Sequence, residues 1–85
     1  MSTEESVRAF FQEHSKSPLP ADRATFIELR YLDEGLIDSL GIIMMINELE
    51  DKCGVQFSAD DLESYEFQSI GGLIGVIERL KSGST

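Results

Sequence analysis

Ser39 is the residue whose type and setting are best suited to chemistry. It follows the carboxylate of Asp38 and precedes an apolar run that begins at Leu40 and continues at helical spacing. We therefore expect Ser39 at a helix N-terminus, where unpaired backbone N–H groups and the helix dipole favour an attached phosphate. One presented hydroxyl, without an obvious catalytic set, indicates a protein that carries a group rather than one that cleaves a bond.

Catalytic and metal sites fit the sequence poorly. A serine hydrolase needs a base within hydrogen-bond reach of its nucleophile, and the sole histidine, His14, is predicted on the core edge of the first helix. A calcium-binding EF-hand loop that began at Asp33 would need glycine sixth and glutamate twelfth, where this chain has Asp38 and Met44. We therefore predict no catalytic residues and no metal ligands.

The surroundings of Ser39 are more specific than the Asp-Ser-Leu triplet alone. Gly35 precedes the triplet, an amphipathic helical pattern follows it, and a second small acidic segment comes later in a short chain. With these features the chain resembles the acyl carrier protein family, over about residues 3–80 and most clearly over residues 33–49. The resemblance implies an all-α fold, namely a small four-helix bundle with a long loop between helices one and two and a short third helix.

The resemblance also implies a prosthetic group and a role. In that family the serine of the triplet carries 4′-phosphopantetheine derived from coenzyme A, so Ser39 would be the attachment point, with Asp38 and Leu40 beside it. The protein would hold acyl intermediates as thioesters on this arm and deliver them to partner enzymes without catalysing any step. The implied partners are a phosphopantetheinyl transferase, an acyl-activating ligase or synthase, and acyltransferases.

Three residues depart from the pattern common in fatty acid biosynthesis, and one of them, Ile42, replaces a polar residue near the pocket mouth. Gly41 and Met44 stand where that pattern usually has acidic residues, which favours a specialised lipid or secondary pathway. The run from Glu34 to Gly41 is also similar to D-alanyl carrier proteins, so an aminoacyl carrier is the alternative. A third interpretation is an unmodified helical adaptor, in which Ser39 serves only as an N-cap.

Length, charge and composition limit the partners. The 85 residues predict one domain, residues 1–85, with its core over about residues 3–80 and a flexible tail over residues 81–85. Sixteen acidic and seven basic residues give a net charge of −9, which argues against nucleic acid or an anionic membrane and favours enzymes with basic docking patches. No run is apolar enough to insert into a membrane, the acidic start is unlike a secretory signal, and Cys53 is the only cysteine. We expect a cytoplasmic protein and, as for small carriers of this type, a monomer.

Capping and helix-breaking residues predict the first half of the fold. Ser2 and Glu5 match a capping box that opens helix one, and residues 17–20 contain two prolines that end it. Residues 21–35 fit neither a helix nor a strand. They are predicted to form a long ordered loop with a helical turn after Asp22.

The second half is predicted to contain three helices. Helix two covers residues 39–52, and a short third helix follows Ser58 over residues 59–65. Ser69 is the expected cap of helix four. Its predicted buried stripe contains Ile70, Leu73, Ile74, Ile77 and Leu80.

The helical pattern gives helix two a core face and a partner face. In the carrier family, acyl chains enter between helices two and four. The expected acyl pocket is therefore lined by Ile42, Met45, Ile46, Leu49, Ile70 and Ile74. The expected partner-docking residues point away from the core and are Leu40, Ile43, Met44, Asn47, Glu48 and Asp51.

Three glycines in helix four bear on the size of that pocket. Gly71, Gly72 and Gly75 each cost about 1 kcal/mol relative to alanine in a helix interior. They could leave room for a long chain, or they could allow close packing against large residues such as Phe10 or Phe67. Alanine at all three positions is predicted to raise the melting temperature, and unchanged protection of an acyl chain in that variant would contradict the pocket interpretation.

Overall fold

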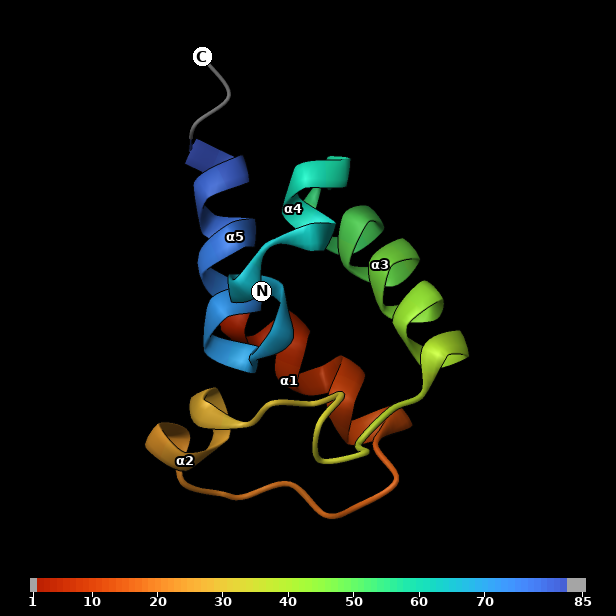
Figure 1. The fold of residues 1–85 in the computed structure, drawn as a ribbon. Coiled ribbons are helices and arrows are strands. Elements are labelled where there is room, and N and C mark those ends of the chain that lie inside the picture. Colours follow the sequence, from red (N-terminus) through yellow and green to blue (C-terminus); the bar gives the residue numbers. More distant parts are fainter. Residues whose placement is uncertain (1, 83–85) are drawn as a thin grey trace.

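The computed structural model describes residues 2–82, and every regular element in that range is helical. The elements are α1 (Thr3–His14), α2 (Arg23–Glu28), α3 (Ser39–Cys53), α4 (Ala59–Glu63), the 3-10 turn η1 (Tyr65–Gln68) and α5 (Ile70–Ser82). Helix α1 packs against both α3 and α5, and α5 also packs against α2 and η1. Figure 1 shows the long connection between α1 and α3, which contains α2, running across one end of the fold.

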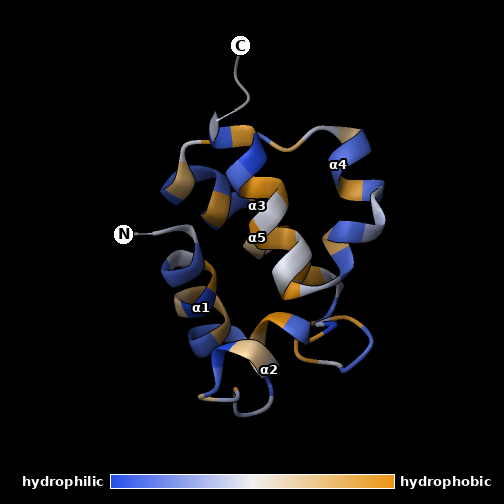
Figure 2. Cartoon of the chain, turned by 90° about the vertical axis from the view of Figure 1, so that its left-hand side faces the viewer, coloured by the Kyte–Doolittle hydropathy of each residue, from blue (hydrophilic) through white to orange (hydrophobic). Residues whose placement is uncertain are grey.

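The core is built from the apolar faces of these helices. Figure 2 shows α5 as hydrophobic or nearly neutral along its first half and hydrophilic toward its C-terminal end. The pattern of α5 identified Ile70, Leu73 and Ile77 correctly, but it missed Val76, which is also fully buried. The buried apolar side chains are Val7, Phe10, Phe11, Phe26, Tyr31, Leu36, Ile37, Met45, Leu49, Phe57, Phe67, Ile70, Leu73, Val76 and Ile77.

The predicted helix ends agree with the observed capping. Ser2 and Glu5 form the capping box of α1, with the Ser2 hydroxyl accepting from the Glu5 N–H at 3.1 Å. Ser58 caps α4 in the same way with Asp61, and Gly54, at φ 68°, ends α3. These are the positions where a side-chain acceptor or a left-handed residue satisfies the free backbone groups of a helix end.

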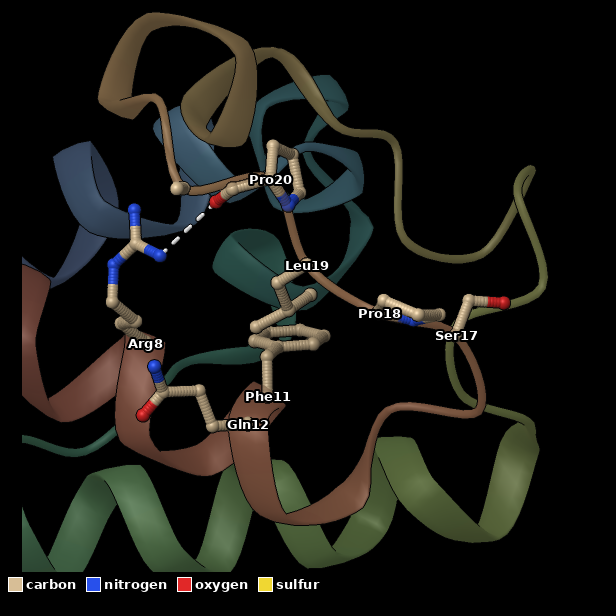
Figure 3. Close-up of a pocket in the computed structure, with 8 residues that line it drawn as sticks. Arg8, Phe11, Gln12, Ser17, Pro18, Leu19 and Pro20 are labelled. Carbon is tan, nitrogen blue, oxygen red and sulfur yellow. Dashed lines mark hydrogen bonds between the residues drawn. The ribbon is translucent and has the colours of Figure 1, made fainter.

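The region predicted as a loop with one helical turn contains a whole helix. The carboxylate of Asp22 accepts from the Thr25 N–H at 2.9 Å and opens α2, whose Phe26 is fully buried. Arg8 holds this connection against α1, because its guanidinium donates to the Pro20 carbonyl at 3.2 Å (Figure 3). The same guanidinium lies 4.1 Å from the centre of the Phe26 ring. The described chain therefore has five α-helices where four were expected.

Two other boundaries differ from the prediction. The short helix α4 ends at Glu63, and the chain continues in η1 rather than in the same helix. Helix α5 includes Lys81 and Ser82, which were expected to begin the flexible tail. The rest of that predicted tail, residues 83–85, lies outside the described residues.

The three glycines of α5 have different surroundings. A Cβ atom on Gly72 would overlap the carbonyl oxygen of Glu66, and one on Gly71 would lie 2.9 Å from the carbonyl oxygen of Ile27. A Cβ on Gly75 would meet nothing within 4 Å. Close packing therefore explains two of the glycines, against the backbone of η1 and α2 rather than the expected aromatic rings. The prediction that alanine at all three positions raises the melting temperature is wrong, because backbone atoms cannot yield as a side chain can.

The buried hydroxyl of Tyr31 leads to a testable prediction about stability. The side chain is fully buried, and its hydroxyl has no hydrogen-bond partner among the described residues. Since a buried unsatisfied group carries a desolvation penalty, Tyr31→Phe is expected to raise the free energy of unfolding by about 1 kcal/mol. The midpoint of urea denaturation measures this difference, and a lower midpoint for the variant would contradict it.

The same variant should change the response to alkaline pH. Burial raises the pKa of Tyr31 well above its usual value. Below the unfolded-state pKa of tyrosine, near 10, the hydroxyl is protonated in both states and the free energy of unfolding is unaffected by pH. Above that value the unfolded state loses the proton while the folded state keeps it, so the free energy of unfolding falls as the pH rises. The stability advantage of Tyr31→Phe should therefore grow above about pH 10.

Candidate functional site

The segment that leads into α3 is fixed by buried side chains and by hydrogen bonds. Leu36 and Ile37 are each only 4 % exposed and anchor the chain directly before Asp38. The Leu36 N–H donates to the Tyr31 carbonyl at 2.9 Å, and the Leu36 carbonyl accepts from the Lys16 N–H at 2.9 Å. The start of α3 is therefore tied to the end of α1.

A second set of contacts ties the same segment to η1. The Arg30 guanidinium donates to the Asp33 carboxylate at 2.6 Å, to the Tyr65 hydroxyl at 2.9 Å and to the Gln68 side-chain oxygen at 2.8 Å. These contacts raise the pKa of Arg30, first through the Asp33 hydrogen bond. Because these three partners share one planar guanidinium group, Arg30 links the segment before α3 to η1, which comes after α3 in the sequence.

Ser39 is the first residue of α3, and its side chain is exposed. The N-cap is Asp38, not Ser39: one carboxylate oxygen of Asp38 accepts from the Gly41 N–H at 2.9 Å. This hydrogen bond, followed by the contact with Lys16, lowers the pKa of Asp38. The Ser39 hydroxyl is thus not needed to cap the helix, which contradicts its assignment as the N-cap in the adaptor interpretation.

Beside Ser39 lies a groove between the end of α1 and the first turn of α3. It has a volume of about 190 Å³. The Lys16 ammonium nitrogen at its edge is 3.4 Å from the second carboxylate oxygen of Asp38. The groove is lined by His14, Lys16, Ile37, Asp38, Leu40, Gly41 and Met44.

His14 does not form a catalytic pair with Ser39. Its ring stacks on Phe10, with centres 4.5 Å apart, and its Nε2 atom lies 3.9 Å from a carboxylate oxygen of Glu48. Asp38 directs its oxygens to Gly41 and Lys16 rather than to this histidine. The arrangement presents a hydroxyl without activating it, so an external enzyme would have to supply the base.

The structure explains why position 41 is a glycine, which the sequence alone did not indicate. A Cβ atom at this position would lie 2.8 Å from the Cβ of buried Ile37. An acidic residue here would therefore force the backbone to shift. The absence of an acid at position 41 follows from packing, which leaves Met44 as the departure from the fatty acid pattern that faces outward.

The predicted docking residues occupy one outer face of α3, with one exception. The side chains of Leu40, Ile43 and Met44 are 65 %, 57 % and 41 % exposed. Asn47 and Asp51 are also exposed. Glu48 is partly buried and forms an ion pair with Lys52 at 3.3 Å, so it is less available to a partner than expected.

The predicted pocket residues fall into two groups. Met45, Leu49 and Ile70 are fully buried, whereas Ile42, Ile46 and Ile74 are partly buried against the core. Ile74 borders a groove lined otherwise by Ser2, Thr3, Glu4, Arg23, Glu78 and Lys81, none of them in α3. The structure thus brings the α3 residues together but places Ile74 toward the start of α1 and α2.

Residues 2–82 show no sign of a metal centre or of a membrane-spanning helix. In that part of the chain, no three or more His, Cys, Asp or Glu side chains gather closely enough to hold a metal ion. None of the described helices has the length and apolar character needed to cross a membrane.

The structure defines a small all-helical domain that presents an unactivated serine at the start of its longest helix. A helix N-terminus suits an attached phosphate group, and the Lys16 ammonium group contacts Asp38, the residue directly before this serine. The sequence model of the family described as "Phosphopantetheine attachment site" matches residues 22–77, and the chain belongs to this family. No curated protein matches the chain.

Membership implies a covalently attached 4′-phosphopantetheine prosthetic group. Domains of this family generally work as non-catalytic carriers, together with a phosphopantetheinyl transferase and partner enzymes. When bound, the arm supplies a terminal thiol on which cargo is held as a thioester.

Proposed function

We propose that this protein is an acyl carrier protein whose 4′-phosphopantetheine arm is attached to Ser39. The observation that carries the proposal is the placement of Ser39, an exposed hydroxyl at the first position of α3 with the capping role taken by Asp38. The matched region includes this residue. Leu40, the residue directly after Ser39, is 65 % exposed, so a transferase can reach the Ser39 hydroxyl from solvent.

The loading reaction is balanced with coenzyme A as the donor. The Ser39 oxygen attacks the phosphorus atom that bears pantetheine, and a new oxygen–phosphorus bond forms. The phosphorus–oxygen bond to the second phosphate breaks, and adenosine 3′,5′-bisphosphate leaves. The transferase supplies the base that takes the serine proton and the metal ion that balances the phosphate charge, because this chain presents neither at Ser39.

The cargo is proposed to be an acyl group in a specialised lipid or secondary pathway. Met44 supports a dedicated partner set, because it places an exposed apolar side chain where the common fatty acid pattern has an acid. The second candidate cargo is an aminoacyl group, favoured by the run from Glu34 to Gly41. Acyl and aminoacyl groups use the same thiol, so the enzyme that activates the cargo decides between them.

Loading assays with two ligase classes distinguish these cargoes. The phosphopantetheinylated protein is incubated with ATP and either an acyl-activating or a D-alanine-activating ligase from its own host. Intact mass then shows which group is added. An acyl adduct alone supports the proposal, and a D-alanyl adduct alone would replace it with the aminoacyl alternative.

The exposed face of α3 leads to a prediction about partner binding. Ile43→Asp is expected to lower kcat/KM of a phosphopantetheinyl transferase about tenfold, mainly through KM, because it places a charge within an apolar contact. Gln56→Asp is the matched control, since Gln56 is exposed beyond the end of α3 and should leave the rate unchanged. Both variants should retain wild-type helical circular dichroism. Equal loss of rate in the two variants would show that overall charge, not the α3 face, causes the effect.

A further inference from the structure

We propose that the groove between the end of α1 and the first turn of α3 binds the proximal part of the phosphopantetheine arm, with the Lys16 ammonium group paired to its phosphate. This inference rests on the proposed attachment at Ser39. It assigns a role to Lys16, a residue that the sequence pattern did not single out.

Lys16 is held beside the attachment point by its own backbone. Its N–H donates to the Leu36 carbonyl at 2.9 Å, and Leu36 lies three positions before Ser39 in sequence. Its ammonium nitrogen is 3.4 Å from the Asp38 carboxylate, the residue directly before Ser39. The cation is therefore positioned at Ser39 by contacts that exist before any arm is attached.

The pair between Lys16 and Asp38 can be rearranged at little cost. Both side chains are more than half exposed, at 62 % and 61 %, and exposed ion pairs contribute little to stability. Asp38 keeps its capping role through the other oxygen, which accepts from Gly41. The Lys16 ammonium group can therefore move from Asp38 to a phosphate while Asp38 continues to cap α3.

Attachment of the arm places two negative charges side by side, and Lys16 can reduce the repulsion between them. The phosphodiester adds a negative charge next to the Asp38 carboxylate in a protein that already has a net charge of −9. Among the residues that line the groove, His14 lies within 3.9 Å of the carboxylates of Glu13 and Glu48, whereas Lys16 faces Asp38. Lys16 is therefore the lining cation that already contacts the residue directly before Ser39.

The rest of the groove suits the next part of the arm. Its walls include the apolar side chains of Ile37, Leu40 and Met44. The phosphate of phosphopantetheine is followed by a methylene group and then by a carbon that bears two methyl groups, so an anionic end and an apolar segment come in this order. The groove lining provides both a cation, Lys16, and apolar side chains for these two parts of the arm.

A thermodynamic cycle tests the proposal with stability as its readout. Melting temperatures are measured for the unloaded and loaded forms of the wild type, Lys16→Gln, Lys16→Arg and Lys52→Gln, and intact mass verifies loading. Lys52 is the matched control, because it pairs with Glu48 at the far end of α3. The change on loading should be about 2–4 °C less favourable in Lys16→Gln than in the wild type. Lys16→Arg and Lys52→Gln should behave as the wild type does.

Two further measurements make the outcome specific. The difference between Lys16→Gln and the wild type should disappear in 1 M salt, where exposed charges are screened. The ³¹P NMR resonance of the loaded protein should shift in Lys16→Gln and not in Lys52→Gln. Equal changes in melting temperature and an unchanged ³¹P resonance would overturn the proposal. A failure of the wild type to gain the arm would instead overturn the attachment at Ser39 on which it depends.

Discussion

Ser39→Ala is expected to abolish attachment of phosphopantetheine and to leave the fold almost unchanged. The variant removes the only oxygen that the proposal uses as acceptor, so the rate should fall to background and not merely decrease. The fold should persist because Asp38 caps α3 and because alanine is a favourable residue within the first helical turn. Intact mass after incubation with coenzyme A, magnesium and a broad-specificity transferase measures the first effect, and thermal melting measures the second.

Ser58→Ala is the appropriate control for this experiment. Ser58 also lies at the start of a helix, but it does cap that helix, with its hydroxyl accepting from the Asp61 N–H at 3.1 Å. Ser58→Ala should therefore lose stability and keep full loading, the reverse of Ser39→Ala. If the folded wild type gained no mass even with the transferase of its own host, the adaptor interpretation would lead, with α3 as its binding face.

Gly72→Ala is expected to destabilise the protein strongly, by about 2–3 kcal/mol or roughly 10–20 °C in melting temperature. The added methyl group would occupy the position of the Glu66 carbonyl oxygen, so either η1 or α5 must move. Helix α5 packs closely along η1, and neither partner has a flexible side chain at this point that could turn aside.

Gly75→Ala is the matched substitution in the same helix, and it should have the opposite effect. Nothing lies within 4 Å of the added Cβ, so the gain in helix propensity of about 0.5–1 kcal/mol should be realised. Thermal melting of both single variants and of the pair measures the contrast. If Gly72→Ala were as stable as the wild type, the close approach of η1 to α5 would not describe the protein in solution.

Local signals in the sequence were sufficient for the long helices. Capping residues and apolar spacing predicted α1, α3 and most of α5 because each helix is long enough to show its pattern over several turns. Helix α2 was reduced to a single turn because six residues do not establish a period and so short a helix is marginal alone. It is stabilised instead by the burial of Phe26 beneath Arg8, a contact between residues that are distant in sequence.

The candidate site shows the same division between local and distant information. The position of Ser39 and the exposure of Leu40 and Ile43 followed from the winding of a single helix. The contact of Lys16 with Asp38 could not be predicted, because it joins two segments that are separated by α2. Packing likewise explains Gly41, whose neighbour Ile37 becomes close only when the chain turns into α3.

The hydrogen bond from the Lys16 N–H to the Leu36 carbonyl has a consequence for how this fold tolerates change. It brings the two ends of residues 17–35 together, so that this segment, whose helix α2 packs against α5, begins and ends at the same place in the fold. The position of Ser39 at the start of α3 therefore depends on the closure of this segment rather than on its length. Insertions at exposed positions such as Ser17 and Pro18 would lengthen a closed excursion, whose entropy depends only weakly on the number of residues. Sequence drift or an engineered tag in this segment can thus be accommodated without relocating Ser39.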